Sequence, residues 1–213
     1  MAKPDSSKRS GPDSQPDSRQ KILAAAKEEF AQHGLAGARV DRIARKAGVN
    51  KAMLYYHFQS KDNLYRQTVG EIIAGNLGRI SKEVSHKSNL DELLPALARQ
   101  YAQLLGGDNT MRKVLLQELA NPHPQVFELM AETIIKSGLP EIVITAIENE
   151  TKSGQLRPVD LRHALASFMA LNIGYIIVSP IVDRVLKVTD KEQFHNERTE
   201  AVVDLFLNGV KKK

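Results

Sequence analysis

The sequence predicts an all-α protein with a small N-terminal group of helices and a longer helical C-terminal part. Apolar residues recur every three or four positions along most of the chain, which is the spacing of one helix face. No segment alternates apolar and polar residues with the period of two that a half-buried strand would show. Residues 1–66 hold 13 Lys and Arg against 7 Asp and Glu, a net charge of +6, whereas residues 67–213 hold 17 against 18, a net charge of −1. This asymmetry is typical of a basic nucleic-acid module joined to a nearly neutral body.

Residues 1–17 are predicted to form a disordered tail. Pro, Ser, Asp and Gly dominate this stretch, which has too few apolar side chains to offset the entropy of ordering. It also lacks the apolar segment of a secretory signal. The first helix is expected to begin at Asp17 or Ser18, both good helix caps, and to end near His33, before Gly34. Its buried face would be formed by Ile22, Leu23, Ala26 and Phe30.

Residues 39–58, RVDRIARKAGVNKAMLYYHF, predict two short helices joined by a tight turn. Gly48 can adopt the left-handed conformation that ends the first of them. Leu54 and Phe58, four residues apart, would form the inner face of the second helix. Its outer face combines hydrogen-bond donors, a cation and aromatic rings without an acidic residue, which suits a helix in the DNA major groove. This face consists of Asn50, Lys51, Ala52, Met53, Tyr55, Tyr56 and His57.

A fourth helix is expected after the cap residue Ser60 and to continue to about Ile80. It contains Gly70, Gly75 and Gly78, each of which lowers helix stability relative to alanine. Two interpretations of these glycines remain open, a flexible relay or close packing against a neighbouring helix.

The rest of the chain also has helical periodicity. Further helices are predicted at about 90–105, 110–120, 126–138, 140–147 and 191–210. Residues 163–182 carry no formal charge over twenty positions, so their length alone would permit a transmembrane helix. Polar residues within the segment favour an amphipathic core helix used for subunit association, and no membrane partner is expected; these residues are His163, Ser167, Asn172 and Ser179.

Residues 22–64 resemble the N-terminal domain of TetR/AcrR-type transcriptional regulators. The chain departs from the family pattern twice. Ala38 and Arg39 replace the usual hydroxyl residues before the first motif helix, which would weaken its cap by about 1 kcal/mol, although Arg39 could contact phosphate itself. Arg42 replaces a common aspartate and would add positive charge beside the DNA face. The matching residues are Ile22 to Ala26, Phe30, Gly34, Val40, Ile43–Ala44, Ala47–Gly48–Val49, Leu54–Tyr55–Tyr56–His57–Phe58, Ser60–Lys61 and Leu64.

The resemblance implies a domain plan and a function. It implies a helix-turn-helix DNA-binding domain at 18–65 and a helical effector-binding and dimerisation domain at 66–213. The protein would be a cytoplasmic, sequence-specific repressor, a homodimer through its last two helices, bound to a palindromic operator and released by a small molecule. Its two recognition helices would lie about 34–36 Å apart. The alternatives are a transcriptional activator, or a small-molecule-binding protein or enzyme that keeps the helix-turn-helix as a scaffold.

The family pattern also assigns residues to DNA and to an effector. Base contacts are expected from Lys51, Ala52, Met53 and Tyr55, and phosphate contacts from Arg39, Asn50, Tyr56, His57 and Lys61, although His57 could do either. An apolar or aromatic effector is expected in the C-terminal helices, by analogy with the fold. Its pocket would be lined by Tyr101, Leu105, Met111, Phe127, Met130, Phe168, Met169, Asn172 and Tyr175, unless these side chains simply fill the core.

Catalytic and metal sites have little support in the sequence. The chain has no cysteine, so it can form neither a disulfide nor a thiolate metal site, which fits a reducing cytoplasm. Its six histidines include no pair four residues apart, and it has neither a GxGxxG nor a GxxxxGK phosphate loop. We therefore expect no enzymatic activity, no cofactor and no metal.

Overall fold

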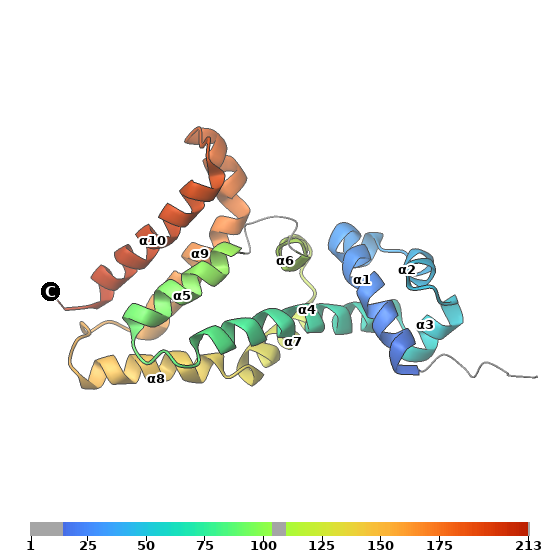
Figure 1. Ribbon diagram of the computed structural model, residues 1–213, viewed down its shortest axis with the longest axis horizontal. Helices are drawn as coiled ribbons and strands as arrows, with labels where there is room; N and C mark the ends of the chain where they lie inside the picture. The colour runs from blue at the N-terminus through green and yellow to red at the C-terminus, as the bar shows by residue number, and fades with distance from the viewer. Residues whose placement is uncertain (1–14, 104–109, 213) are drawn as a thin grey trace, which may run out of the picture. The chain divides into compact units, whose positions relative to one another are not determined.

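The structure is a computed structural model that describes residues 15–103 and 110–212, and it is almost entirely helical (Figure 1). The prediction of an all-α fold is confirmed. Within the described ranges the only β-type pairing is an isolated bridge between Leu156 and Lys211. The helices are α1 (Gln15–Gly37), α2 (Val40–Ala47), α3 (Lys51–Phe58), α4 (Lys61–Val84), α5 (Leu90–Gln103), α6 (Thr110–Ala120), α7 (Pro124–Lys136), α8 (Leu139–Lys152), α9 (Leu161–Val185) and α10 (Lys191–Val210).

The first helix differs from its predicted bounds at both ends. Most of the predicted tail lies outside the described residues, but Gln15–Asp17 belong to α1, ahead of the predicted cap. At the other end, Gly34 has φ 61° and ψ −176°, so the helix kinks there and its last turn continues to Gly37. Glycine allows this backbone because it has no Cβ.

The chain divides into two compact units between Thr68 and Val69, within α4. The first unit contains α1 to α3 and the first two turns of α4. Phe30 and Tyr65, both almost completely buried, pack edge to face with their ring centroids 4.9 Å apart. Burial of apolar side chains is the main stabilising contribution in such a core. The other large side chains with at most 2% exposure here are Ile22, Leu23, Ile43, Leu54, Phe58 and Leu64.

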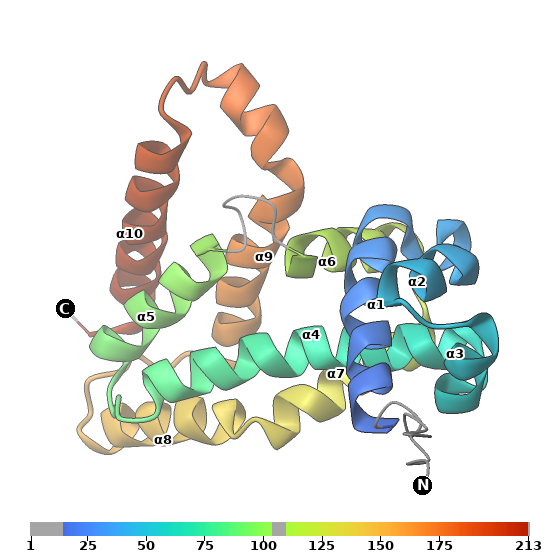
Figure 2. The ribbon, with the colours of Figure 1, turned by 45° about the vertical axis from the view of Figure 1, so that its right-hand side comes forward.

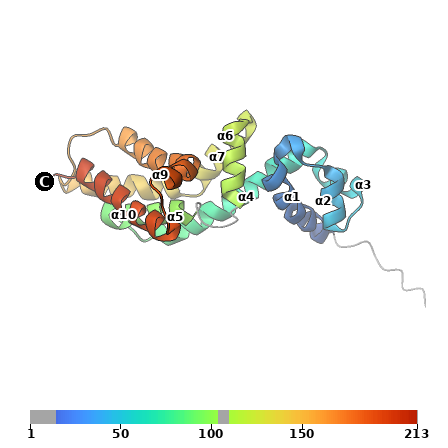
Figure 3. The same ribbon diagram turned by 90° about the horizontal axis from the view of Figure 1, so that it is seen from above.

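The second unit runs from Val69 onwards and is organised around α5. This helix packs against α8, α9 and α10, and Figures 2 and 3 show it alongside α10. Its fully buried apolar residues include Leu90, Leu93 and Leu94, which join a core formed with side chains of α8, α9 and α10. The sequence therefore predicted this helix, at about 90–105, and tertiary packing supplied the partners of its buried face.

Only one of the three α4 glycines is explained by close packing. A Cβ at Gly70 would lie 3.2 Å from a methyl carbon of Leu129 on α7, so glycine permits the close approach of these helices. A Cβ at Gly75 or Gly78 would meet nothing within 4 Å. The structure gives no packing reason for these two.

The hairpin of α9 and α10 buries polar residues and exposes apolar ones. Asp183, only 8% exposed, lies 3.3 Å from Lys191 Nζ and 3.4 Å from His195 Nε2, both on α10. On α10, Leu205 is 66% exposed. The exposed large apolar residues of α9 are Met169, Leu171, Ile177, Val178, Ile181 and Val185.

Among the described helices, α9 alone is long and apolar enough to cross a membrane, by length and composition. In its most apolar window, 28% of the helix is buried inside the chain. The buried Asp183 and its ion pair with Lys191 on α10 suit a packed helical hairpin better than a lipid environment, because an ion pair in hydrocarbon is costly.

Candidate nucleic-acid interface

The turn between α2 and α3 has the geometry that the sequence predicts. Gly48 adopts φ 68° and ψ 29°, and its N–H donates to the carbonyls of Ala44 and Arg45. Val49 then donates to the Ala44 carbonyl at 3.0 Å, which reverses the chain. A non-glycine residue at position 48 would be strained because an L-residue avoids this conformation.

The start of α3 is fixed by a local cap. The Oδ1 atom of Asn50 accepts a hydrogen bond of 2.7 Å from the Met53 N–H, which satisfies one of the unpaired amides of the first turn. Because this oxygen is occupied and a phosphate oxygen only accepts hydrogen bonds, a phosphate contact from the Asn50 side chain would use its amide nitrogen. On the inner side of α3, Leu54 and Phe58 are fully buried, so the opposite side of the helix faces outward.

The outer face of α3 presents the predicted base-reading residues. Lys51 and Ala52 are exposed, Tyr55 is 41% exposed, and Met53 is half-buried. The α3 helix has no acidic residue of its own, but Asp41 of α2 lies beside it: Lys51 Nζ is 3.0 Å from Asp41 Oδ1. This hydrogen bond raises the pKa of Lys51. Both side chains are about half exposed or more, so the pair is weak and can be exchanged for DNA.

The predicted phosphate-contacting residues lie around this face and differ in their exposure and in the hydrogen bonds that they already form. Tyr56 is 66% exposed, and Arg39 is exposed just before α2. Lys61 Nζ donates to the Ala36 carbonyl at 3.3 Å, and the Ser60 hydroxyl caps α4 by accepting from the Asn63 N–H at 3.0 Å. His57 Nε2 is buried without a hydrogen-bond partner, so a contact from this atom would require the ring to rotate.

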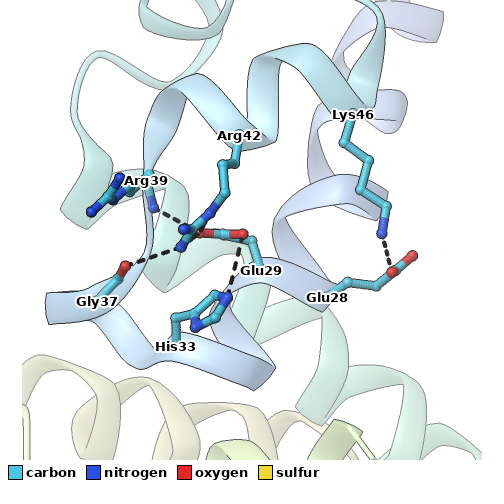
Figure 4. A network of polar contacts seen from close by, with 7 residues as sticks. All are labelled: Glu28, Glu29, His33, Gly37, Arg39, Arg42 and Lys46. Carbon is cyan, nitrogen blue, oxygen red and sulfur yellow. Dashed lines mark hydrogen bonds and ion pairs between the residues drawn. The ribbon is translucent and has the colours of Figure 1, made fainter.

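Glu29 links α1 to the beginning of α2 (Figure 4). Its Oε1 accepts from the Arg39 N–H at 2.8 Å and from Arg42 Nε at 2.8 Å, and Arg42 Nη2 also donates to it. His33 Nε2 lies 3.9 Å from the second oxygen. The Arg39 side chain provides no cap, so the first turn of α2 is capped by a carboxylate from another helix.

One expectation from the sequence changes as a result. Arg42 does not add a free positive charge, because it is bound to Glu29 and donates to the Gly37 carbonyl at 3.3 Å. Position 39 provides no side-chain cap, and the Glu29 carboxylate satisfies the Arg39 N–H that precedes α2. Glu29 was not among the site residues predicted from the sequence. One signal was available: Glu29 follows Ile22 by seven residues and Ala26 by three, so it lies on the apolar stripe of α1.

The predicted effector residues have different surroundings in the described part of the chain. Phe127 and Met169 are 40% and 43% exposed. Phe168 packs edge to face on Phe206, and Tyr175 is covered by the Arg198 guanidinium, 3.7 Å from its ring centroid. Leu105 lies outside the described residues, and the remaining ones are Tyr101, Met111 and Met130, which are half-buried, and Asn172, which is buried.

An open groove of about 1010 Å³ lies between α5 and α10. Arg99, His195 and Thr199 are among its lining residues, and none of the predicted effector residues is. The described ranges also contain no group of three or more His, Asp or Glu residues arranged to hold a metal ion.

Comparisons with known proteins agree with this architecture. Residues 22–68 match the family model described as bacterial regulatory proteins of the tetR family. The transcriptional regulator RutR of Escherichia coli K12 is 28% identical over 205 residues, which cover 89% of each protein. The regulator FadR of Bacillus subtilis, solved with stearoyl-CoA, is 22% identical with a TM-score of 0.66, over 89% of this chain and 98% of FadR. A transcriptional regulator of Saccharomonospora viridis, solved with choline, is 19% identical with a TM-score of 0.71, over 93% and 100%.

Proposed function

We propose that this chain is a ligand-responsive DNA-binding transcriptional regulator of the TetR family. It would be a repressor that binds a palindromic operator as a homodimer and leaves it when a small molecule binds. The observation that carries the DNA-binding part is the α2–α3 motif, with Leu54 and Phe58 buried and Lys51, Tyr55 and Tyr56 exposed on the opposite side. The relatives are transcriptional regulators, and we propose a cytoplasmic protein without enzymatic activity.

We assign the residues on and beside the outer face of the motif to two tasks. Lys51, Ala52, Met53 and Tyr55 face base edges, where cationic, hydroxyl and apolar groups discriminate between base pairs. The second group, which contacts phosphates and positions α3 without reading sequence, comprises Arg39, Asn50, Tyr56, His57 and Lys61. For Lys51 the Asp41 carboxylate would be exchanged for DNA at little cost, since the pair is exposed.

The proposed dimer interface is the apolar surface of α9 and α10. Ile181 and Val185 on α9, and Leu205 on α10, are each at least 66% exposed in the single chain. Exposed large apolar side chains along two helices are typical of an interface, and a two-fold axis would pair this surface with itself. A two-fold dimer would bring two α3 helices to successive major grooves of a palindromic operator.

For the effector we propose a small molecule with a large apolar part, bound in the second unit. The predicted lining is Tyr101, Leu105, Met111, Phe127, Met130, Phe168, Met169, Asn172 and Tyr175. Burial raises the pKa of Tyr101, so its hydroxyl is neutral at physiological pH and could orient a ligand by hydrogen bonding. An effector would release DNA if it bound one dimer conformation better than the other, by about 1–3 kcal/mol.

The direct test of this function is selection of bound fragments from genomic DNA. We expect an enriched palindrome whose two half-sites are about one helical turn apart. The genes beside it would indicate the chemical class of the effector, and their expression with and without the protein would distinguish repression from activation. A protein that kept the motif only as a scaffold would enrich no sequence and show no salt-dependent DNA affinity.

Replacing Tyr55 with alanine should reduce sequence discrimination. We expect the ratio of operator affinity to random-DNA affinity to fall by roughly tenfold, because one base contact contributes about 1–3 kcal/mol. Fluorescence anisotropy with operator and scrambled duplexes at one salt concentration measures this ratio. The matched control is Tyr56→Ala, which should weaken both duplexes alike. An unchanged ratio in Tyr55→Ala would contradict the base-reading assignment.

Replacing Lys61 with alanine should weaken binding to every DNA sequence by a similar factor. The slope of log K against log salt should become shallower by about one, since one phosphate contact is lost. Titrations at several salt concentrations measure the slope. Lys82→Ala removes the same charge near the other end of α4 and should leave the slope unchanged. A changed sequence preference in Lys61→Ala would show that this lysine reads bases.

A further inference from the structure

We propose that Glu29 is a positioning residue for DNA binding: its carboxylate, on α1, caps the start of α2 and holds Arg42 against α1. The orientation of the α2–α3 motif would then depend on a charged link between two helices instead of a cap within α2. The effect on DNA rests on the proposed function, whereas the capping role can be tested without DNA.

Burial makes this link energetically important. Glu29 is only 9% exposed, and a buried carboxylate is costly unless charged or N–H donors satisfy it. Burial by itself would raise the pKa of Glu29. Hydrogen bonds from Arg42 and the Arg39 amide, with the nearby charges of Arg42 and His33, outweigh burial and lower this pKa below its usual value. The carboxylate is therefore ionised at neutral pH and accepts from the α2 amide as a charged cap, which is stronger than a neutral one.

The neighbouring residue provides a comparison within the same pair of helices. Glu28 also bonds a cation of α2, Lys46, and both side chains are more than half exposed. An exposed pair of this kind contributes little to stability. Glu28 and Glu29 thus each form one ion pair with α2. They differ in burial, and the Glu29 carboxylate also accepts a hydrogen bond from the backbone N–H of Arg39.

The link also determines which arginine is available to DNA. The Arg42 guanidinium donates to the Glu29 carboxylate and to the Gly37 carbonyl. The Arg39 side chain is exposed and in Figure 4 points away from Glu29, while its backbone N–H is held. Glu29 therefore neutralises Arg42 and fixes the backbone from which Arg39 extends towards a phosphate.

The capping role is tested by thermal unfolding of the full-length protein without DNA. Glu29→Ala should lower Tm by roughly 5–10 °C, because it removes a cap and leaves Arg42 unpaired. Glu28→Ala should change Tm by about 1 °C or less. Arg39→Ser places a hydroxyl at the cap position of α2 and should recover at least half of the Tm lost in Glu29→Ala, since serine is a good cap. Equal Tm losses for the two glutamates, or no recovery with Arg39→Ser, would overturn the capping role.

The effect on Arg42 is tested by the salt dependence of DNA binding. Glu29→Gln keeps an oxygen that can accept from the Arg39 N–H but removes the charge that holds Arg42. We expect the slope of log K against log salt to steepen by about one, as Arg42 reaches a phosphate. The steepening should disappear in the Glu29→Gln/Arg42→Gln double variant. An unchanged slope in Glu29→Gln would overturn this part of the proposal. If the wild-type protein itself showed no salt-dependent DNA binding, the proposed function would fail, and the Tm series would still decide the capping role.

Discussion

Replacing Ile181 with glutamate is expected to convert the dimer into a monomer and to lower operator affinity by about 100-fold or more. Ile181 is 66% exposed on α9, within the apolar surface proposed as the interface. A carboxylate buried there in two copies would be unpaired and desolvated, which strongly opposes association. A monomer would bind one half-site and lose the 10²–10⁴-fold gain, in order of magnitude, that two linked sites provide.

Sedimentation velocity and operator titration measure the two parts of this prediction. The matched control is Ile135→Glu, the same substitution at a residue of α7 that is 64% exposed. It should leave both the dimer and the operator affinity intact. A dimeric Ile181→Glu protein with wild-type affinity would place the interface on another surface. A wild-type protein that partitions with lipid vesicles would instead favour the membrane interpretation of α9.

Replacing Phe58 with alanine should lower the free energy of unfolding of the DNA-binding unit by about 3–5 kcal/mol. Phe58 is the last residue of α3 and is fully buried. The Arg19 guanidinium lies 5.5 Å from its ring centroid. Removing the ring leaves a cavity that rigid neighbouring helices fill only in part, so α3 would lose its support and operator binding would be lost with it.

Urea unfolding followed by circular dichroism measures the stability, and anisotropy measures DNA binding on the same samples. Tyr56→Ala is the control, two residues earlier on the same helix and 66% exposed. It should weaken DNA binding while leaving the urea midpoint almost unchanged, because an exposed ring contributes little to the core. A stable Phe58→Ala protein that still bound the operator would show that the inner face of α3 is not needed to present the outer one.

Local features of the motif could be read directly from the sequence. Val40, Ile43, Ala44 and Ala47 have the spacing of one helix face, and all four are buried on α2. Gly48 ends α2 in the left-handed conformation expected of it. These features depend on helix geometry and on the conformational freedom of one residue, so a few neighbouring positions determine them.

Contacts between helices could not be read in this way. Glu29 and Arg42 are 13 positions apart on different helices, and Lys51 meets Asp41 across the turn. The exposure of Leu205 appears only when the neighbours of α10 are known. The effector assignments depend in the same way on which helices enclose a cavity.

The sequence by itself determined the helices, their apolar faces and the motif that α3 presents, because periodicity, caps and turn glycines act within a few residues. Only the tertiary structure decided that a carboxylate of α1 caps α2, that Arg42 is bound to it, and that α9 retains an exposed apolar face. Those outcomes depend on the angles and distances at which whole helices pack, which no single segment of the sequence contains.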